Sequence, residues 1–144
     1  MGGSQIAGKN VTAEKIFHNL PRHDLLYIEM MLFIIDTWDE ENLYISVDQR
    51  NFTIKMPGWQ DYSIKQNICG EYYPDNYIQY RTLVIHNSTT LNLSINSNLD
   101  EPASNEAWGF RNLTIILVNL TKSQKISDIG EFSCAINSFT TPVL

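Results

Sequence analysis

Residues 43–56 read Leu-Tyr-Ile-Ser-Val-Asp-Gln-Arg-Asn-Phe-Thr-Ile-Lys-Met, and this stretch decides the fold class. Large apolar side chains recur at every second position from Leu43 to Val47 and again from Phe52 to Met56. Successive side chains of an extended chain point to opposite faces, so a period of two fits a strand with one buried face. The stretch therefore predicts two short β-strands separated by a turn and followed by the chain-breaking pair Pro57-Gly58.

Similar strand-like segments recur along the chain, broken by turns rich in Asn, Asp, Gly and Pro. Residues 25–35 also fit a helix, because Leu, Met and Glu favour helices. Seven or eight strands without a repeat predict an all-β fold, a single two-sheet antiparallel sandwich or jelly roll over residues 15–144. A polar N-terminal arm at residues 1–14 precedes it. The further predicted strands are residues 25–35, 77–86, 91–95, 113–120 and 132–139.

The composition limits the classes of partner. The chain has 144 residues, of which 43% are hydrophobic, enough for one domain with a full core. Its net charge of −6 disfavours nucleic acid and anionic membrane surfaces, both of which are bound through Lys and Arg. No segment reaches the roughly 18–20 apolar residues of a membrane-spanning helix. We therefore expect neither a nucleic-acid partner nor a membrane span.

Six Asn-X-Ser/Thr triplets, the acceptor sequence for N-linked glycans, are the most informative motif. The chain has 14 Asn and 21 Ser plus Thr, frequencies at which chance gives about two such triplets. Attached glycans are bulky and must face solvent. The excess predicts an extracellular or cell-surface glycoprotein, whereas the alternative is a polar, Thr-rich chain from an Asn-rich proteome. The triplets begin at Asn10, Asn51, Asn87, Asn92, Asn112 and Asn119.

The chain has two cysteines, Cys69 and Cys134. An even number in an extracellular protein favours a disulfide over two buried thiols. The loop that such a bond closes, about 65 residues long, would stabilise the fold by on the order of 4 kcal/mol in the chain-entropy model. Because no Cys-X-X-Cys pair is present, neither redox nor zinc chemistry is expected.

Three blocks of sequence are Leu20-Pro21-Arg22-His23, Phe33-Ile34-Ile35-Asp36-Thr37-Trp38-Asp39-Glu40-Glu41 and Asn105-Glu106-Ala107-Trp108-Gly109-Phe110-Arg111-Asn112. In order and spacing they resemble the N-terminal β-rich module of ciliate-type cell-surface proteins that often carry cysteine-rich repeats. There the blocks run like Leu-Pro-Pro-His, Ile-Asp-Ser-Trp-Asp-Asn-Glu and Asp-Glu-Ser-Trp-Gly-Ile-Arg-Asp. The resemblance covers roughly residues 15–120 and implies a location more than an activity. The chain has Asn112 where that group has Asp, and this difference weakens a metal site inferred from the resemblance. It also ends without the cysteine-rich region, as expected of a free-standing subunit.

Two acidic segments are candidates for holding a calcium ion. One follows the predicted strand at residues 25–35, and the other is the loop from Asp100 to Glu106. If both lie at one end of the sandwich, they can supply the six to eight oxygens that calcium takes. The alternative is two solvated acidic loops, because the spacing does not match the twelve-residue calcium loop. The candidate ligands are Asp36, Asp39, Glu40, Asp100 and Glu106.

Tryptophans and tyrosines are candidates for stacking on sugars, because an aromatic ring offers a flat apolar face to sugar C–H groups. Trp38 and Trp108 flank strand ends and are expected in the core instead. Trp59 and the pair Tyr72-Tyr73 lie in the segment around Cys69. These three are the predicted ligand-contact residues of an exposed surface.

No catalytic motif is present. The histidines His18, His23 and His86 are scattered, and the chain has neither a Gly-X-Ser-X-Gly elbow nor a phosphate-binding loop. Two of the carboxylates from Asp36 to Glu41 could act as the catalytic pair of a glycosidase only if they faced each other across a substrate. The spacing of residues along the chain does not show whether they do. We therefore expect that the protein is not an enzyme.

Two functions fit these patterns. The first is a structural or interaction role in which the chain assembles into extracellular fibres, with a terminal segment (residues 1–19 or 132–144) adding a strand to a neighbouring copy. The alternative is a lectin-like, carbohydrate-binding module, with or without calcium. The expected partners are therefore other copies of the chain, or glycans.

Overall fold

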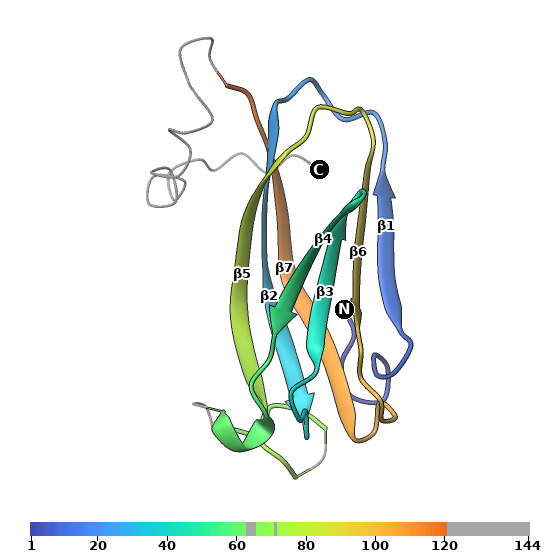
Figure 1. Ribbon diagram of the computed structural model, residues 1–144, viewed down its shortest axis with the longest axis vertical. Coiled ribbons are helices and arrows are strands. Elements are labelled where there is room, and N and C mark those ends of the chain that lie inside the picture. Colours follow the sequence, from blue (N-terminus) through green and yellow to red (C-terminus); the bar gives the residue numbers. More distant parts are fainter. Residues whose placement is uncertain (63–65, 71, 121–144) are drawn as a thin grey trace.

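The computed structural model describes residues 1–62, 66–70 and 72–120, and their strands form two antiparallel sheets packed together (Figure 1). One sheet has the strand order β1-β6-β3-β4, and the other has the order β5-β2-β7. The predicted all-β sandwich is therefore confirmed. None of the described residues forms a helix long and apolar enough to cross a membrane. The elements are β1 Thr12–Phe17, β2 Leu25–Asp36, β3 Asn42–Val47, β4 Arg50–Lys55, the 3₁₀ helix η1 Trp59–Asp61, β5 Asn76–Ile85, β6 Leu91–Ser97 and β7 Glu106–Val118.

The strand β2 lies in the middle of the three-stranded sheet, and its inward side chains form the centre of the core. It pairs with β5 from Leu25↔Ile85 to Ile34↔Asn76, and with β7 on its other side. This confirms a strand at residues 25–35 and excludes the helical alternative. Alternate residues of β2 and β3 are at most 1% exposed, as the period of two requires: Leu26, Ile28, Met30, Leu32, Ile34, Leu43, Ile45 and Val47.

The strand β7 begins at Glu106, well before the predicted residues 113–120. Small and polar residues interrupt the apolar pattern of its first half, so periodicity did not reveal it. The register with β2 shifts once along the strand, and Asn112 has a φ of 55°. Asn tolerates this left-handed conformation at a bulge better than most residues. The early start places Glu106 directly opposite Asp36 of β2.

The N-terminal residues belong to the sandwich, and the predicted boundary between arm and domain falls inside β1. This strand pairs with β6 from Thr12↔Asn96 to Phe17↔Leu91. Upstream, the Gly3 N–H donates to the Trp108 carbonyl at 2.8 Å, and Ala7 is 2% exposed. Residues 1–17 are therefore paired within their own chain. The predicted strand at residues 132–139 and the C-terminal tail lie outside the described residues.

The prediction that Trp38 and Trp108 belong to the core is confirmed, since they are 0% and 1% exposed. Trp38 follows β2, and its indole N–H donates to the Ala107 carbonyl at 2.8 Å. The Trp38 carbonyl accepts the backbone N–H of Trp59 at 2.7 Å. Trp38 therefore joins β7 and the segment that follows β4 at the same end of the sandwich.

Candidate functional site

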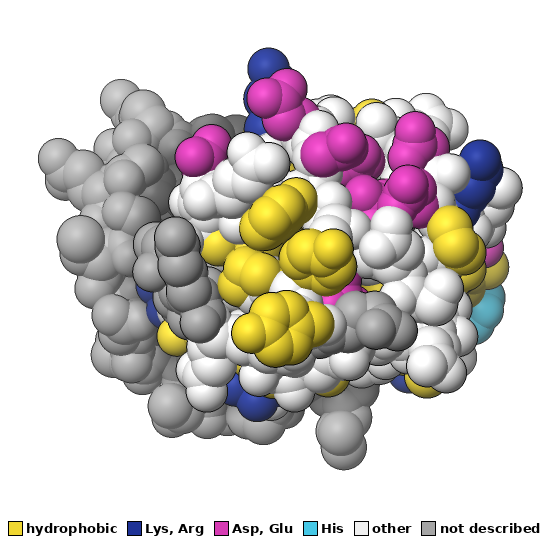
Figure 2. All heavy atoms as spheres, turned by 90° about the horizontal axis from the view of Figure 1, so that it is seen from below, with side chains coloured by type: hydrophobic (Ala, Val, Ile, Leu, Met, Phe, Trp, Pro, Cys, Tyr) yellow, Lys and Arg dark blue, Asp and Glu magenta, His cyan; other side chains and the backbone are white. Residues whose placement is uncertain are grey.

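The candidate site lies at the end of the sandwich that is at the bottom of Figure 1. The strand directions bring three connections to it: β2–β3 at residues 37–41, β4–β5 at residues 56–75 and β6–β7 at residues 98–105. Viewed face-on in Figure 2, hydrophobic side chains gather near the centre of this surface, and acidic side chains lie beside them. We call this surface the aromatic end.

The three predicted ligand-contact residues all lie at the aromatic end. Trp59 on η1 is half-buried, whereas Tyr72 is 94% exposed and Tyr73 is 39% exposed. The rings of Trp59 and Tyr73 meet edge to face, with their centroids 5.3 Å apart and an interplanar angle of 67°. This is a favourable arrangement of two aromatic rings and limits the motion of both. Ile68 adds apolar surface to the same connection and is 46% exposed.

A buried carboxylate, Asp75, holds the connection that carries the tyrosines. Its Oδ2 accepts the backbone N–H groups of Ile68 at 2.6 Å and Cys69 at 2.8 Å. Its Oδ1 accepts the backbone N–H of Asp36 at 3.0 Å, and the residue is 0% exposed. These three hydrogen bonds from one buried side chain attach the connection to the end of β2. No local sequence signal separates Asp75 from an ordinary turn aspartate.

Asp36 packs under the same connection. It is the last residue of β2 and is 0% exposed. Gly70 has a φ of 97°, and a Cβ atom there would lie 2.1 Å from Asp36 Oδ2. Glycine is required at this position because of both its backbone conformation and the lack of space for a side chain.

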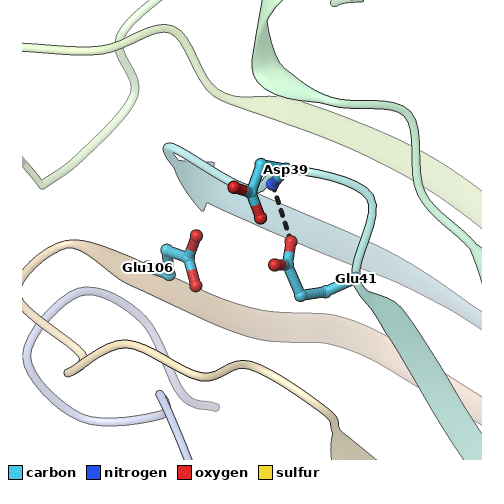
Figure 3. Close-up of side chains that lie close together, drawn as sticks. All are labelled: Asp39, Glu41 and Glu106. Carbon is cyan, nitrogen blue, oxygen red and sulfur yellow. Dashed lines mark hydrogen bonds between the residues drawn. The ribbon is translucent and has the colours of Figure 1, made fainter.

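Three carboxyl groups converge at the aromatic end: those of Asp39, Glu41 and Glu106 (Figure 3). One oxygen from each lies within 4.8 Å of the others. Asp39 and Glu41 come from the β2–β3 connection, and Glu106 opens β7. The Asp39 backbone N–H donates to Glu41 Oε2 at 2.7 Å, which holds the two ends of this short turn together. We call these three residues the acidic triad.

Burial controls the protonation of the acidic triad. Glu106 is 2% exposed, Glu41 is 8% exposed and Asp39 is exposed. Burial raises the pKa of Glu106 to about 8, and the negative charges of Glu41 and Glu101 act in the same direction. Burial likewise raises the pKa of Glu41 to about 7, with its contact to Asp39 adding to the effect. The two buried groups therefore bind protons near neutral pH when no cation is present.

Some buried polar atoms of this region have no hydrogen-bond partner among the described residues. They include Glu106 Oε2 and the hydroxyl oxygen of Tyr62. Tyr62 is 2% exposed, and burial, followed by the charges of Asp75 and Glu41, raises the pKa of its hydroxyl. Buried polar atoms in folded proteins nearly always have a partner, so an unpaired carboxylate oxygen indicates a place for a further group.

The predicted calcium ligands come together only in part. Asp39 and Glu106 belong to the acidic triad, which Glu41 completes. The prediction did not include Glu41, although the residue belongs to the same acidic run. Side-chain direction within this run depends on the turn between β2 and β3, which spacing alone does not reveal. The predicted ligands outside the triad are Asp36, which packs under Gly70, and the exposed Glu40 and Asp100.

The predicted glycosylation sites lie mainly away from the aromatic end. Asn51, Asn87, Asn92 and Asn119 are near the strand ends where β2 begins, at the opposite end of the sandwich. Asn92 is half-buried, and its side-chain amide donates to Glu14 Oε1 at 2.7 Å. The other asparagines are exposed: Asn10, Asn51, Asn87, Asn112 and Asn119.

Cys69 is exposed at the aromatic end. Its predicted partner, Cys134, lies outside the described residues, so the disulfide stays a prediction.

The opposite end of the sandwich contains a buried pair of histidines, and we call it the histidine end. His23 and His86 are 2% and 7% exposed. His23 Nε2 lies 2.6 Å from His86 Nδ1, and the rings stack with their centroids 4.9 Å apart. His86 Nε2 lies 3.1 Å from Oδ2 of Asp48, which follows β3 of the other sheet. The pair therefore connects the two sheets.

Comparisons with known proteins show a likeness in fold. No protein-family model and no curated protein matches the sequence. Among solved structures, the chain is similar to the C-terminal domain of EclA, a sugar-binding protein, with a TM-score of 0.50 and 10% identity over 79% of this chain and 70% of that chain. It is also similar to dimeric latent PorU from Porphyromonas gingivalis, with a TM-score of 0.46 and 13% identity over 80% of this chain and 12% of that chain. At these identities the likeness concerns the β-sandwich alone.

Proposed function

We propose that this chain is a carbohydrate-binding module and that the aromatic end is its binding surface. The observation that carries the proposal is the ring pair formed by Trp59 and Tyr73, beside the fully exposed Tyr72. A sugar presents apolar C–H groups, which stack on aromatic rings, and hydroxyls, which bond to carboxylates. The aromatic end offers both kinds of group on one surface (Figure 2).

The ring pair is held in place before any ligand arrives. Trp59 is fixed by its edge-to-face contact with Tyr73 and by its backbone bond to Trp38. The tyrosine segment follows residues 68 and 69, which Asp75 holds through two hydrogen bonds. A surface that is ordered in advance loses less conformational entropy on binding, which favours a weakly interacting ligand such as a sugar. Exposed apolar patches of this kind commonly mark binding sites.

The likeness to the EclA domain is consistent with this proposal but supports it only at the level of the fold. That domain is described as a sugar-binding protein, so a β-sandwich similar to this one serves as a scaffold for sugar binding there. No residue of that domain is carried over to this chain. The proposal for this chain depends on its own aromatic end.

We also propose that the chain is a secreted or cell-surface N-linked glycoprotein that binds without catalysing a reaction. The number of acceptor triplets, the exposure of five of their six asparagines and the resemblance to cell-surface modules support this location. Four of the sites lie at the histidine end. Glycans attached there would leave the aromatic end uncovered for a ligand.

Trp59→Ala is expected to weaken glycan binding by about 10- to 100-fold, because loss of a central aromatic contact removes about 1.4–2.8 kcal/mol of binding free energy. Tyr73→Ala should also weaken binding, since Tyr73 both contributes surface and orients Trp59. A glycan array with the purified wild-type chain identifies the ligand, and calorimetry then gives the dissociation constant for each variant.

A matched control for these variants is Tyr44→Ala. Tyr44 is half-buried on β3 and alternates with the core residues Leu43 and Ile45, so its side chain is on the outer face of the sheet. This variant should bind glycan as the wild type does. The proposal is wrong if the wild-type chain binds no glycan on the array, or if Trp59→Ala and Tyr44→Ala bind equally well.

The intact mass of chain produced in a eukaryotic secretory pathway should fall on enzymatic deglycosylation. We expect glycans at the five exposed asparagines and least occupancy at Asn92, whose amide is already bonded to Glu14. Alkylation without reductant should leave Cys69 and Cys134 unmodified, because the disulfide protects both thiols. An unchanged mass together with full alkylation of the two cysteines would contradict the proposed location.

Assembly into fibres through an exchanged terminal strand, the first function predicted from the sequence, has less support. The N-terminal segment hydrogen-bonds within its own chain through β1 and Gly3, and the tail lies outside the described residues. Size-exclusion chromatography with light scattering separates the two proposals. A monomer that binds glycans supports a binding module, whereas a polymer that binds none supports fibre formation.

A further inference from the structure

We propose that the acidic triad of Asp39, Glu41 and Glu106 is a binding site for a divalent cation, with calcium as its preferred ion. The proposal stands on the geometry of these carboxyl groups and does not depend on sugar binding. It replaces the predicted set of five ligands with one that the fold assembles from the β2–β3 connection and the first residue of β7.

The pairing of β2 with β7 creates the triad. Asp36 of β2 lies opposite Glu106, and the chain then turns back within a few residues to begin β3. Asp39 and Glu41 lie in this turn, and Figure 3 shows all three carboxyl groups directed toward a common point. Trp38, which is fully buried and bonded to the Ala107 carbonyl, fixes the turn against β7. The relative positions of the three ligands are therefore set by core packing and not by a loose loop.

Glu106 gives the second and independent observation. Its side chain is 98% buried, since the residue is 2% exposed, and its Oε2 has no hydrogen-bond partner among the described residues. A buried carboxylate oxygen without a partner is costly, because it has lost its water and gained nothing in return. A cation at the point where the three carboxyl groups meet would bond to this oxygen and remove the cost.

No basic side chain neutralises the triad within the described residues. The ion pairs there join Arg81 to Glu29 and His86 to Asp48, neither of which involves the aromatic end. Three carboxylates brought together without a counter-charge repel one another, and they either bind protons or bind a cation. An all-oxygen, triply negative site matches the hard cations calcium and magnesium, not zinc or copper.

Coordination chemistry favours calcium over magnesium. Oxygens of the triad lie within 4.8 Å of one another, close enough for a single ion to contact all three. Magnesium demands near-ideal octahedral geometry and gives up its water reluctantly. Calcium accepts irregular coordination completed by water or a ligand hydroxyl, which suits three protein ligands at a surface edge.

The experiment is calorimetry and thermal unfolding of the full chain after chelation, with calcium chloride and magnesium chloride added separately. Calcium at about 100 times its dissociation constant should raise the melting temperature by roughly 5–10 °C. Glu106→Gln, which keeps the shape and removes the charge, should weaken calcium binding at least tenfold. Glu40→Gln is the control, because Glu40 is an exposed neighbour outside the triad, and it should bind calcium as the wild type does.

Circular dichroism of the variants after removal of calcium by chelator tests whether Glu106→Gln remains folded. Asp39→Asn is a second variant for the same test, and because Asp39 is exposed, this substitution should disturb folding less. The proposal is overturned if the wild-type chain shows no calcium-dependent heat or shift, or if Glu106→Gln and Asp39→Asn bind calcium as tightly as Glu40→Gln. Magnesium binding as tight as calcium binding would overturn the choice of calcium. Measurement of glycan binding with a chelator present keeps this result separate from the proposed function.

Discussion

Trp38→Ala is expected to lower the free energy of unfolding by about 4 kcal/mol, the largest single effect in the chain. The indole of Trp38 is fully buried between the sheets, and alanine would leave a cavity where that ring was. The substitution also leaves the Ala107 carbonyl without the donor that it has at 2.8 Å. Urea unfolding followed by fluorescence and circular dichroism gives the free energy for the wild type and the variant.

The same substitution should loosen the aromatic end even where the chain stays folded. Trp38 directly precedes Asp39 of the acidic triad, and its carbonyl oxygen accepts the Trp59 backbone N–H. Trp59→Ala is the control for stability, because the half-buried Trp59 lies at the surface, and it should cost less than about 1 kcal/mol. If Trp38→Ala and Trp59→Ala lowered the free energy of unfolding equally, the core would not extend to the aromatic end.

His86→Ala is expected to lower the free energy of unfolding by about 3 kcal/mol, the second-largest effect, because it breaks a buried hydrogen-bonded network. His23 Nδ1 lies 2.6 Å from the Pro21 carbonyl oxygen. His86 Nε2 lies 3.1 Å from both the Thr90 carbonyl oxygen and an Asp48 oxygen. The two rings are joined through His23 Nε2 and His86 Nδ1, which lie 2.6 Å apart.

Asp48 is the third group of this network and belongs to the other sheet. Removing His86 leaves His23 Nε2 without its partner and disconnects Asp48 from His23. His18→Ala is the control, because His18 is exposed, and it should change the stability by no more than about 0.5 kcal/mol. A loss below about 1 kcal/mol for His86→Ala would refute the network.

The sequence predicted the strands whose inward side chains are fully buried. In β3 and β6 the alternation is visible because every second residue meets the core. The sequence of β2 is apolar at nearly every position and also fitted a helix. It did not predict β1, an edge strand whose only half-buried positions are Ala13 and Phe17. Two of its exposed positions are the charged Glu14 and Lys15, so its composition resembles that of a solvated arm. Pairing with β6, a tertiary contact, decides the structure there.

The aromatic part of the site was more predictable than the acidic part. Trp59 and Tyr73 lie in a turn-rich segment in which the sequence predicts no strand. Aromatic side chains in such a segment are expected to be exposed. The acidic triad depends on the register that sets Asp36 opposite Glu106, and on the direction of side chains in the following turn. Asp75 acts through three backbone N–H groups supplied by folding. None of these relations can be read from spacing along the chain.

The two ends of the sandwich differ in chemistry and, on this account, in role. The histidine end is closed by a buried hydrogen-bonded network and carries most of the glycosylation triplets. The aromatic end carries an exposed ring pair and uncompensated carboxylates. A chain anchored or shielded at one end would present the other to a ligand. This division predicts that substitutions at the histidine end change stability without changing ligand affinity.

The central claim is that carbohydrate binds at the aromatic end, and an NMR titration tests it most directly. The ¹⁵N-labelled chain is titrated with the glycan that binds best on the array. We predict saturable shifts of the Trp59 indole N–H and of the backbone amides of Tyr72 and Tyr73, with no shifts at His23 or His86. Saturable shifts confined to another surface, or no shifts at any glycan concentration, would contradict the account.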